Sequence, residues 1–311
     1  MMRNNILGKA ITHLPAELDA ALKWLSVLKV EYSPTRFARY RKILEHVEAA
    51  RIEIETRRIN LESPWVKDGS WYDAMRKLDA FATLFEVNEL AMIHQGLAGK
   101  KLDGYLSPKL KELVSGPDSY VTESGARIKA RNTGFELAVA ARMATAGFLI
   151  EPHPGLADVV ARLNKATYIA ECKRPQSEAG VFDAIRSAGK QLKTRYAQVS
   201  EDAVGIIALD LTKVFNPQLL VEAEVSECEI GQAITNRMNA FLNRHRAEFE
   251  RVGDARTAGI LLRHSLLGWS KSSRRISWVH KYGIRPMPGG SVAGVGAVRL
   301  MERALEVALT L

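Results

Sequence analysis

Three side chains in the middle of the chain have the chemistry of a metal-dependent phosphodiesterase: Asp158, Glu171 and Lys173. Hard divalent cations bind to carboxylate oxygens, and Mg²⁺ is commonly held by one or two carboxylates together with substrate phosphates. A lysine ammonium group beside such a cluster can hold or deprotonate a water molecule. Because Asp158 and Glu171 are well separated along the chain, the hypothesis depends on the elements that bring them together.

A β-hairpin is predicted to do this. Residues 157–163 and 166–173 are rich in aliphatic and β-branched side chains, which is typical of strands. Asn164 and Lys165 between them have the right length for a tight turn. Asparagine tolerates the left-handed backbone conformation that such turns need. The segment therefore predicts two antiparallel strands.

The turn fixes the register of the two strands. If it is centred on the Asn-Lys pair, Leu163 lies opposite Ala166, and the same register places Asp158 opposite Glu171. Directly opposed side chains have Cβ atoms about 4.5–5.5 Å apart. Side chains alternate along a strand, so Glu171 and Lys173 share one face and the cysteine between them points to the other. A cation between the two carboxylates would remove their repulsion.

A Glu-x-Lys triplet is a weak signal by itself. With 35 acidic residues and 18 lysines in 311 positions, about two acidic-x-Lys triplets are expected by chance. Only one occurs, and it lies in this hairpin. The alternative is a solvent-exposed strand face with a lysine–carboxylate pair.

The order of elements around the hairpin resembles that of the PD-(D/E)XK nuclease superfamily. The resemblance covers about residues 126–285 and implies an α/β, restriction-endonuclease-like αβββαβ core with a mixed sheet. The matching elements would be a helix with Glu136, a strand at 148–151, the two hairpin strands, a helix at 178–199 and an apolar strand at 203–211. The motif Glu171-Cys172-Lys173 matches the family pattern, whereas Ala157 stands where the family name has proline.

The resemblance also implies roles for these residues. Asp158 and Glu171 would hold Mg²⁺ (or Mn²⁺), with the Cys172 backbone carbonyl as a further ligand. Glu136 would bind the metal or orient a ligand through water, and Lys173 would activate the attacking water. The products would carry 5′-phosphates.

A second interpretation competes for Glu136. Thr133 and Glu136 have the spacing of a capping box, in which the glutamate only stabilises the start of a helix. That interpretation explains the residue without any metal, and the sequence leaves both open.

Further side chains are candidates for nucleic-acid contact. Basic residues near the hairpin and on the following helix are suited to phosphate groups, and a glutamine and a tyrosine resemble residues of exonuclease-like branches of the superfamily. The candidates are Arg131, Arg174, Arg186, Lys190, Gln191, Lys193 and Tyr196. The alternative for the basic residues is an ordinary solvated surface.

The charge of the chain is uneven. Residues 1–125 hold 18 Lys and Arg against 17 Asp and Glu, which leaves 26 against 18 for residues 126–311. A basic surface attracts phosphate backbones through counterion release. The excess therefore favours a nucleic-acid substrate for the second part, although charge does not separate DNA from RNA.

Residues 1–125 are expected to form an all-α domain. The sequence predicts helices over 16–29, from Ser33-Pro34 to Ile54, and over 70–97. Turn residues at 115–119 favour a boundary with the 126–311 domain. This first domain is suited to substrate positioning, homodimerisation or binding of a protein partner, and the sequence does not choose among them.

Composition excludes several other classes. Two cysteines rule out a disulfide framework and a cysteine-rich zinc site. The chain has no apolar run long enough for a membrane span and no apolar N-terminal leader, so we expect a cytoplasmic protein. The leading hypothesis is a Mg²⁺-dependent deoxyribonuclease, compatible with restriction, phage defence or repair. The alternative is a non-catalytic nucleic-acid-binding or assembly module that retains the fold.

Overall fold

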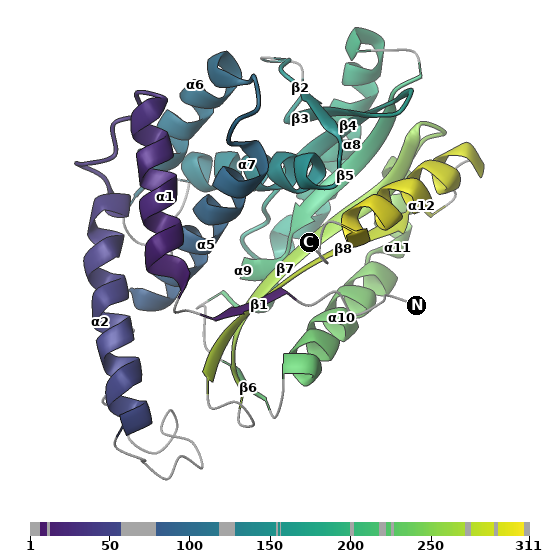
Figure 1. Ribbon diagram of the computed structural model, residues 1–311. Coiled ribbons are helices and arrows are strands. Elements are labelled where there is room, and N and C mark those ends of the chain that lie inside the picture. Colours follow the sequence, from purple (N-terminus) through teal and green to yellow (C-terminus); the bar gives the residue numbers. More distant parts are fainter. Residues whose placement is uncertain are drawn as a thin grey trace.

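The computed structural model describes residues 7–10, 13–56, 79–117, 128–153, 155, 157–199, 202–217, 222–224, 227–270, 275–288 and 292–307. The described residues form one mixed β-sheet with helices on both faces (Figure 1). The strands are β1 (Leu7–Ala10), β2 (Leu149–Glu151), β3 (Val159–Leu163), β4 (Ala166–Lys173), β5 (Val204–Asp210), β6 (Glu222–Glu224), β7 (Thr257–Ser270) and β8 (Arg275–Pro286). The α/β prediction with a mixed sheet is confirmed.

The sheet has the order β1-β8-β7-β5-β4-β3-β2, and β6 pairs with β7 off this path. Parallel pairing joins β4 to β5, β5 to β7 and β6 to β7. The remaining neighbours are antiparallel. The centre of the sheet is therefore parallel and its two flanks are antiparallel.

The helices are α1 (Leu14–Val27), α2 (Arg36–Thr56), α5 (Ala80–Leu97), α6 (Asp103–Val114), α7 (Lys129–Thr145), α8 (Val181–Val199), α9 (Thr212–Phe215), α10 (Glu227–Arg244), α11 (Arg246–Val252) and α12 (Val292–Val307). A 3₁₀ turn, η3 (Glu178–Gly180), precedes α8. None of these described helices is both long and apolar enough to cross a membrane.

The central strand β5 shows why the sheet needs cover on both sides. Ile206 and Ala208 point into one apolar cluster, and Ile207 and Leu209 point into another. The first cluster includes residues of α7 and α12, and the second includes residues of α8, α10 and α11. A strand buried on both faces has a near-continuous apolar sequence rather than an alternating one, as the prediction for 203–211 assumed.

The predicted order of helix, three strands, helix and strand is present as α7-β2-β3-β4-α8-β5. These six elements follow one another in the described chain and place the hairpin β3–β4 between β2 and β5. The predicted helix at 178–199 begins as the 3₁₀ turn η3 before continuing as α8.

The N-terminal helices do not have a core of their own. Residues of α1, α2, α5 and α6 belong to the same apolar cluster as residues of α7 and of the sheet. The α5–α7 contact is close at Gly96, where an added Cβ would lie 2.5 Å from the Ala141 carbonyl oxygen. In Figure 1 the blue helices α5 and α6 lie against α7, and the purple α1 and α2 pack on α5. The helices before residue 125 therefore share one hydrophobic core with the elements that follow it.

The prediction of an all-α first part is wrong at Leu7–Ala10. This segment is β1 and pairs with β8 at the end of the sheet. An edge strand gains its stability from the backbone groups of its neighbour, so a four-residue segment needs no pattern of its own. Of the helix predicted over 70–97, residues 80–97 are helical, and residues 70–78 lie outside the described part.

The helical segment after β6 is divided at His245 into α10 and α11. Gly294 and Gly296 lie within α12, which begins at Val292.

Candidate active site

The hairpin has the predicted register. Leu163 pairs with Ala166 and Val159 pairs with Ala170. Asn164 has φ of +55°, in the left-handed region that favours asparagine at a tight turn. Asp158 is the residue just before β3. The same pairing therefore brings it to the level of Glu171.

The three predicted side chains meet at this end of the hairpin. Lys173 Nζ lies 3.5 Å from Asp158 Oδ2 and 3.5 Å from Glu171 Oε2. Asp158 Oδ2 also accepts a hydrogen bond of 2.8 Å from the Cys172 backbone N–H. Lys173 Nζ in turn donates to the Cys172 carbonyl at 3.1 Å. The structure thus joins two carboxylates, one ammonium group and one peptide unit.

Glu171 is the most unusual of these groups. The residue is 1% exposed, and its Oε1 atom is buried without a hydrogen-bond partner among the described residues. The nearby cation is Arg195 of α8, whose Nε lies 3.7 Å from Oε1. Burial, followed by the negative charge of Asp158, raises the pKa of Glu171 to about 7. A buried carboxylate oxygen that lacks a donor is suited to bind a cation.

Arg195 was not among the predicted site residues, although the sequence contained a signal. Ala188 and Leu192 form the inward face of α8, and Arg195 follows Leu192 by three positions. Residues three or four apart lie on the same face of a helix. This spacing therefore predicts that Arg195 points towards the sheet rather than towards solvent.

Glu136 lies beside the cluster but has a different partner. It forms an ion pair with Lys109 of α6. Burial and the charge of Asp158 raise the pKa of Glu136, and Lys109 offsets part of this rise. The capping-box interpretation is wrong, because α7 begins at Lys129 and Thr133 lies inside it, donating from Oγ1 to Glu112 Oε2 at 3.0 Å.

Two residues of α6 reach the site without having been predicted. Tyr105 donates from its hydroxyl group to the Asp158 carbonyl oxygen at 3.2 Å. Lys109 Nζ lies 3.5 Å from the same oxygen. Nothing in the local sequence of α6 points to the hairpin, so only the fold shows this contact.

The donor set fits one divalent cation held by Asp158 and Glu171. Mg²⁺ needs few protein carboxylates when substrate phosphate completes its coordination. The described residues contain no group of three or more His, Cys, Asp or Glu side chains arranged to hold a metal ion. Glu136 is thus not placed as a third ligand, and the Cys172 carbonyl is hydrogen-bonded to Lys173. The Cys172 side chain is buried, and burial raises the pKa of its thiol.

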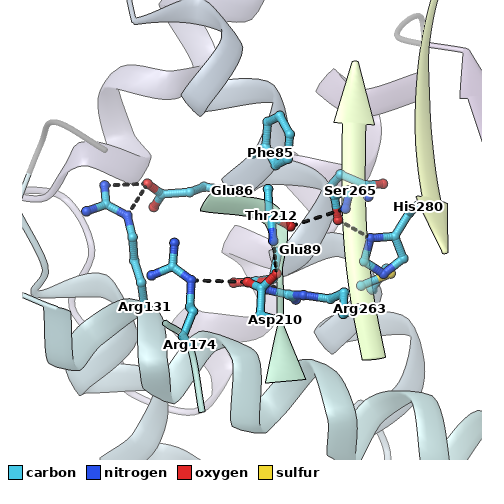
Figure 2. Close-up of a pocket in the computed structure, with 12 residues that line it drawn as sticks. Phe85, Glu86, Glu89, Arg131, Arg174, Asp210, Thr212, Arg263, Ser265 and His280 are labelled. Carbon is cyan, nitrogen blue, oxygen red and sulfur yellow. Dashed lines mark hydrogen bonds and ion pairs between the residues drawn. The ribbon is translucent and has the colours of Figure 1, made fainter. Parts of the chain in front are cut away.

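Two predicted nucleic-acid contacts are corrected by their burial. Arg131 is 2% exposed and its Nη2 lies 2.6 Å from Glu86 Oε1. Arg174 is 8% exposed and its Nε lies 3.1 Å from Asp210 Oδ2. Figure 2 shows both arginines pointing into a polar cavity, each towards its carboxylate. They neutralise buried acids and do not face a phosphate backbone.

This polar cavity lies where α5 meets the sheet. Arg263 of β7 joins the two, since it pairs with Asp210 at 2.6 Å and also with Glu89 of α5. The cations that line the cavity face carboxylates rather than solvent (Figure 2). The cluster therefore fastens the N-terminal helices to the sheet.

The candidates on α8 separate into exposed and buried side chains. Arg186, Lys190 and Lys193 are exposed, as expected of residues that contact a ligand or only solvent, and Gln191 is half-buried. Tyr196 is buried, and its hydroxyl group lies 2.9 Å from Thr257 Oγ1. Tyr196 thus packs between α8 and β7 rather than facing a nucleic acid.

No protein-family model, curated protein or solved structure matches this chain. The argument for function therefore depends on the geometry of the site itself.

Proposed function

We propose that this protein is a metal-dependent nuclease that hydrolyses DNA phosphodiester bonds with a PD-(D/E)XK-type site. One observation carries the proposal: the Lys173 ammonium group lies 3.5 Å from both Asp158 Oδ2 and Glu171 Oε2, in a cluster whose glutamate is almost fully buried. The order of elements around the hairpin supports the same proposal.

Each residue has a defined task in this proposal. Asp158 and Glu171 would hold Mg²⁺ or Mn²⁺, which would supply positive charge to the scissile phosphate and the leaving oxygen. Lys173 orients the attacking water and favours its deprotonation. The water oxygen bonds to phosphorus, the bond from phosphorus to the 3′ oxygen breaks, and the 3′ oxygen leaves as a hydroxyl group that carries the proton given up by the water. The product keeps a 5′-phosphate.

The basic excess in residues 126–311 supports a polyanionic substrate. The exposed side chains of Arg186, Lys190 and Lys193 lie on α8. The same helix also holds Arg195, which contacts Glu171. Of the candidates that remain exposed, these are the ones suited to a phosphate backbone. We propose DNA as the substrate and a cytoplasmic location, with RNA as a comparison in the assay.

The test is a cleavage assay on supercoiled, linear and single-stranded DNA and on RNA, with Mg²⁺ or Mn²⁺ against EDTA. Wild type is compared with Lys173→Ala, Glu171→Gln and the matched control Lys165→Ala. Lys165 lies in the same hairpin but at its exposed turn. Metal-dependent cleavage that is lost in the first two variants and kept in the control supports the proposal. Cleavage that survives Lys173→Ala rejects it.

A second candidate is a nucleic-acid-binding module without catalysis. The observation in its favour is that lysines already compensate the carboxylates: Lys109 pairs with Glu136, and Lys173 lies between Asp158 and Glu171. This candidate predicts salt-sensitive DNA binding in EDTA that is unchanged by Lys173→Ala, with no cleavage by wild type. Binding that weakens uniformly on Lys190→Met, with a smaller salt dependence, would place the DNA on α8.

A further inference from the structure

Helix α6, which belongs to the first 125 residues, contributes two side chains to the candidate active site. Tyr105 and Lys109 both contact the carbonyl oxygen of Asp158, at 3.2 Å and 3.5 Å. Asp158 is thus held at two points, since its carboxylate accepts a hydrogen bond from the Cys172 backbone. The peptide of one proposed metal ligand is fixed from α6, and its side chain is fixed from β4.

The surroundings of the Lys109 ammonium group resemble those of a bound metal ion. Its partners are the Glu136 carboxylate and a peptide carbonyl, both of them oxygen donors that divalent cations use. The ring of Tyr105 lies on another side, with its centroid 5.3 Å from Nζ. The Lys109 ammonium group therefore supplies positive charge to the oxygen donors that a metal ion would use.

We infer that Lys109 takes the place of a second metal ion, so that the site binds a single divalent cation, between Asp158 and Glu171. This inference rests on the proposed function, because it concerns the same metal site. It assigns a role in that site to a residue outside the resemblance, and it explains why Glu136 is close to Asp158 without being arranged as a third ligand.

The charges around the site argue against a second metal ion. The Glu136 carboxylate is already neutralised by Lys109, whereas Asp158 and Glu171 share the Lys173 ammonium group. Loss of Lys109 would leave the Glu136 carboxylate uncompensated and largely buried beside Asp158. A divalent cation is the simplest replacement, because it supplies positive charge to the same oxygen donors.

The experiment is a calorimetric Mn²⁺ titration of the full-length, metal-free protein without DNA, so that no readout depends on activity. Wild type is expected to bind one equivalent, and Lys109→Met is expected to bind two. The double variant Lys109→Met/Glu136→Gln is expected to return to one. Lys111→Met, an exposed position on the same helix, is the matched control and should bind one.

The outcomes separate this inference from the proposed function. Two equivalents bound by wild type, or one equivalent bound by a folded Lys109→Met protein, overturn the inference and leave the nuclease proposal intact. Loss of all Mn²⁺ binding in Glu171→Gln locates the first ion. No Mn²⁺ binding by wild type overturns the inference, and the cleavage assay, in which substrate phosphate is present, then decides the nuclease proposal. The wild-type stoichiometry decides even if Lys109→Met fails to fold.

Discussion

The buried carboxylate of Asp210 offers a direct test of how the N-terminal helices are joined to the sheet. Asp210 is 1% exposed, and its Oδ2 atom pairs with Arg263 at 2.6 Å and with Arg174 at 3.1 Å. Its Oδ1 atom accepts a hydrogen bond of 3.0 Å from the Thr212 N–H. Substitution Asp210→Asn keeps the shape of the side chain and removes the charge that neutralises two buried guanidinium groups.

The expected cost follows from this geometry. Breaking a buried ion pair by removing one partner costs about 3–5 kcal/mol, because the remaining charge is left uncompensated. Asp210 neutralises two cations in one buried cluster, so we expect a loss of unfolding free energy in the upper part of this range. In a chain of this size each kcal/mol corresponds to roughly 2 °C in Tm, so the melting temperature should fall by about 8–10 °C.

Denaturant unfolding followed by fluorescence and by circular dichroism measures the free energy, and calorimetry measures Tm. Asp183→Asn is the matched control, because Asp183 is exposed in the first turn of α8 and its charge is worth no more than about 1 kcal/mol there. A loss below about 1 kcal/mol for Asp210→Asn, or one equal to that of the control, would refute the reasoning.

Two further predictions concern the packing of helices on the sheet. Burial raises the pKa values of Asp210 and Glu86, but the neighbouring guanidinium groups outweigh burial and hold both values below their ordinary ranges. As the pH falls below about 4, the unfolded chain takes up protons first, so the free energy of unfolding should drop. A flat unfolding free energy between pH 5 and pH 2 would contradict this prediction. Gly205→Ala would place a Cβ 2.0 Å from the Tyr196 hydroxyl oxygen, so we expect a loss of about 1–3 kcal/mol. Gly104→Ala should cost less stability, because a Cβ there has no atom of the described residues within 4 Å. Equal losses for the two variants in urea unfolding would contradict the predicted clash.

The hairpin was predictable because its determinants are local. Two short runs of aliphatic and β-branched residues with an asparagine at the turn between them were enough to predict the register, and the register fixes which side chains meet. The pairing of Leu163 with Ala166 was therefore predicted and is confirmed. The same local logic gave the order of elements from α7 to β5.

Burial of charged residues was not predictable in the same way. Arg131 and Arg174 were expected to face a phosphate backbone because charged residues usually face outwards. Their carboxylate partners lie 45 and 36 positions away along the chain. No local pattern reveals such a pairing, so only tertiary structure separates a buried cation from a surface cation. Lys109 was missed for the same reason, since it contacts Asp158 across 49 positions.

These long-range contacts show what the first 125 residues contribute to the fold and to the candidate site. Helix α5 is fastened to the sheet through the pairing of Glu89 with Arg263, and α6 supplies Lys109 to the candidate site. The first contact serves stability, and the second neutralises Glu136 beside the proposed metal site. Asp210→Asn should therefore lower the melting temperature without changing Mn²⁺ stoichiometry in the folded protein, whereas Lys109→Met should change the stoichiometry. If both variants changed the stoichiometry alike, the effect of Lys109 would be an indirect result of loosened packing and not of its charge.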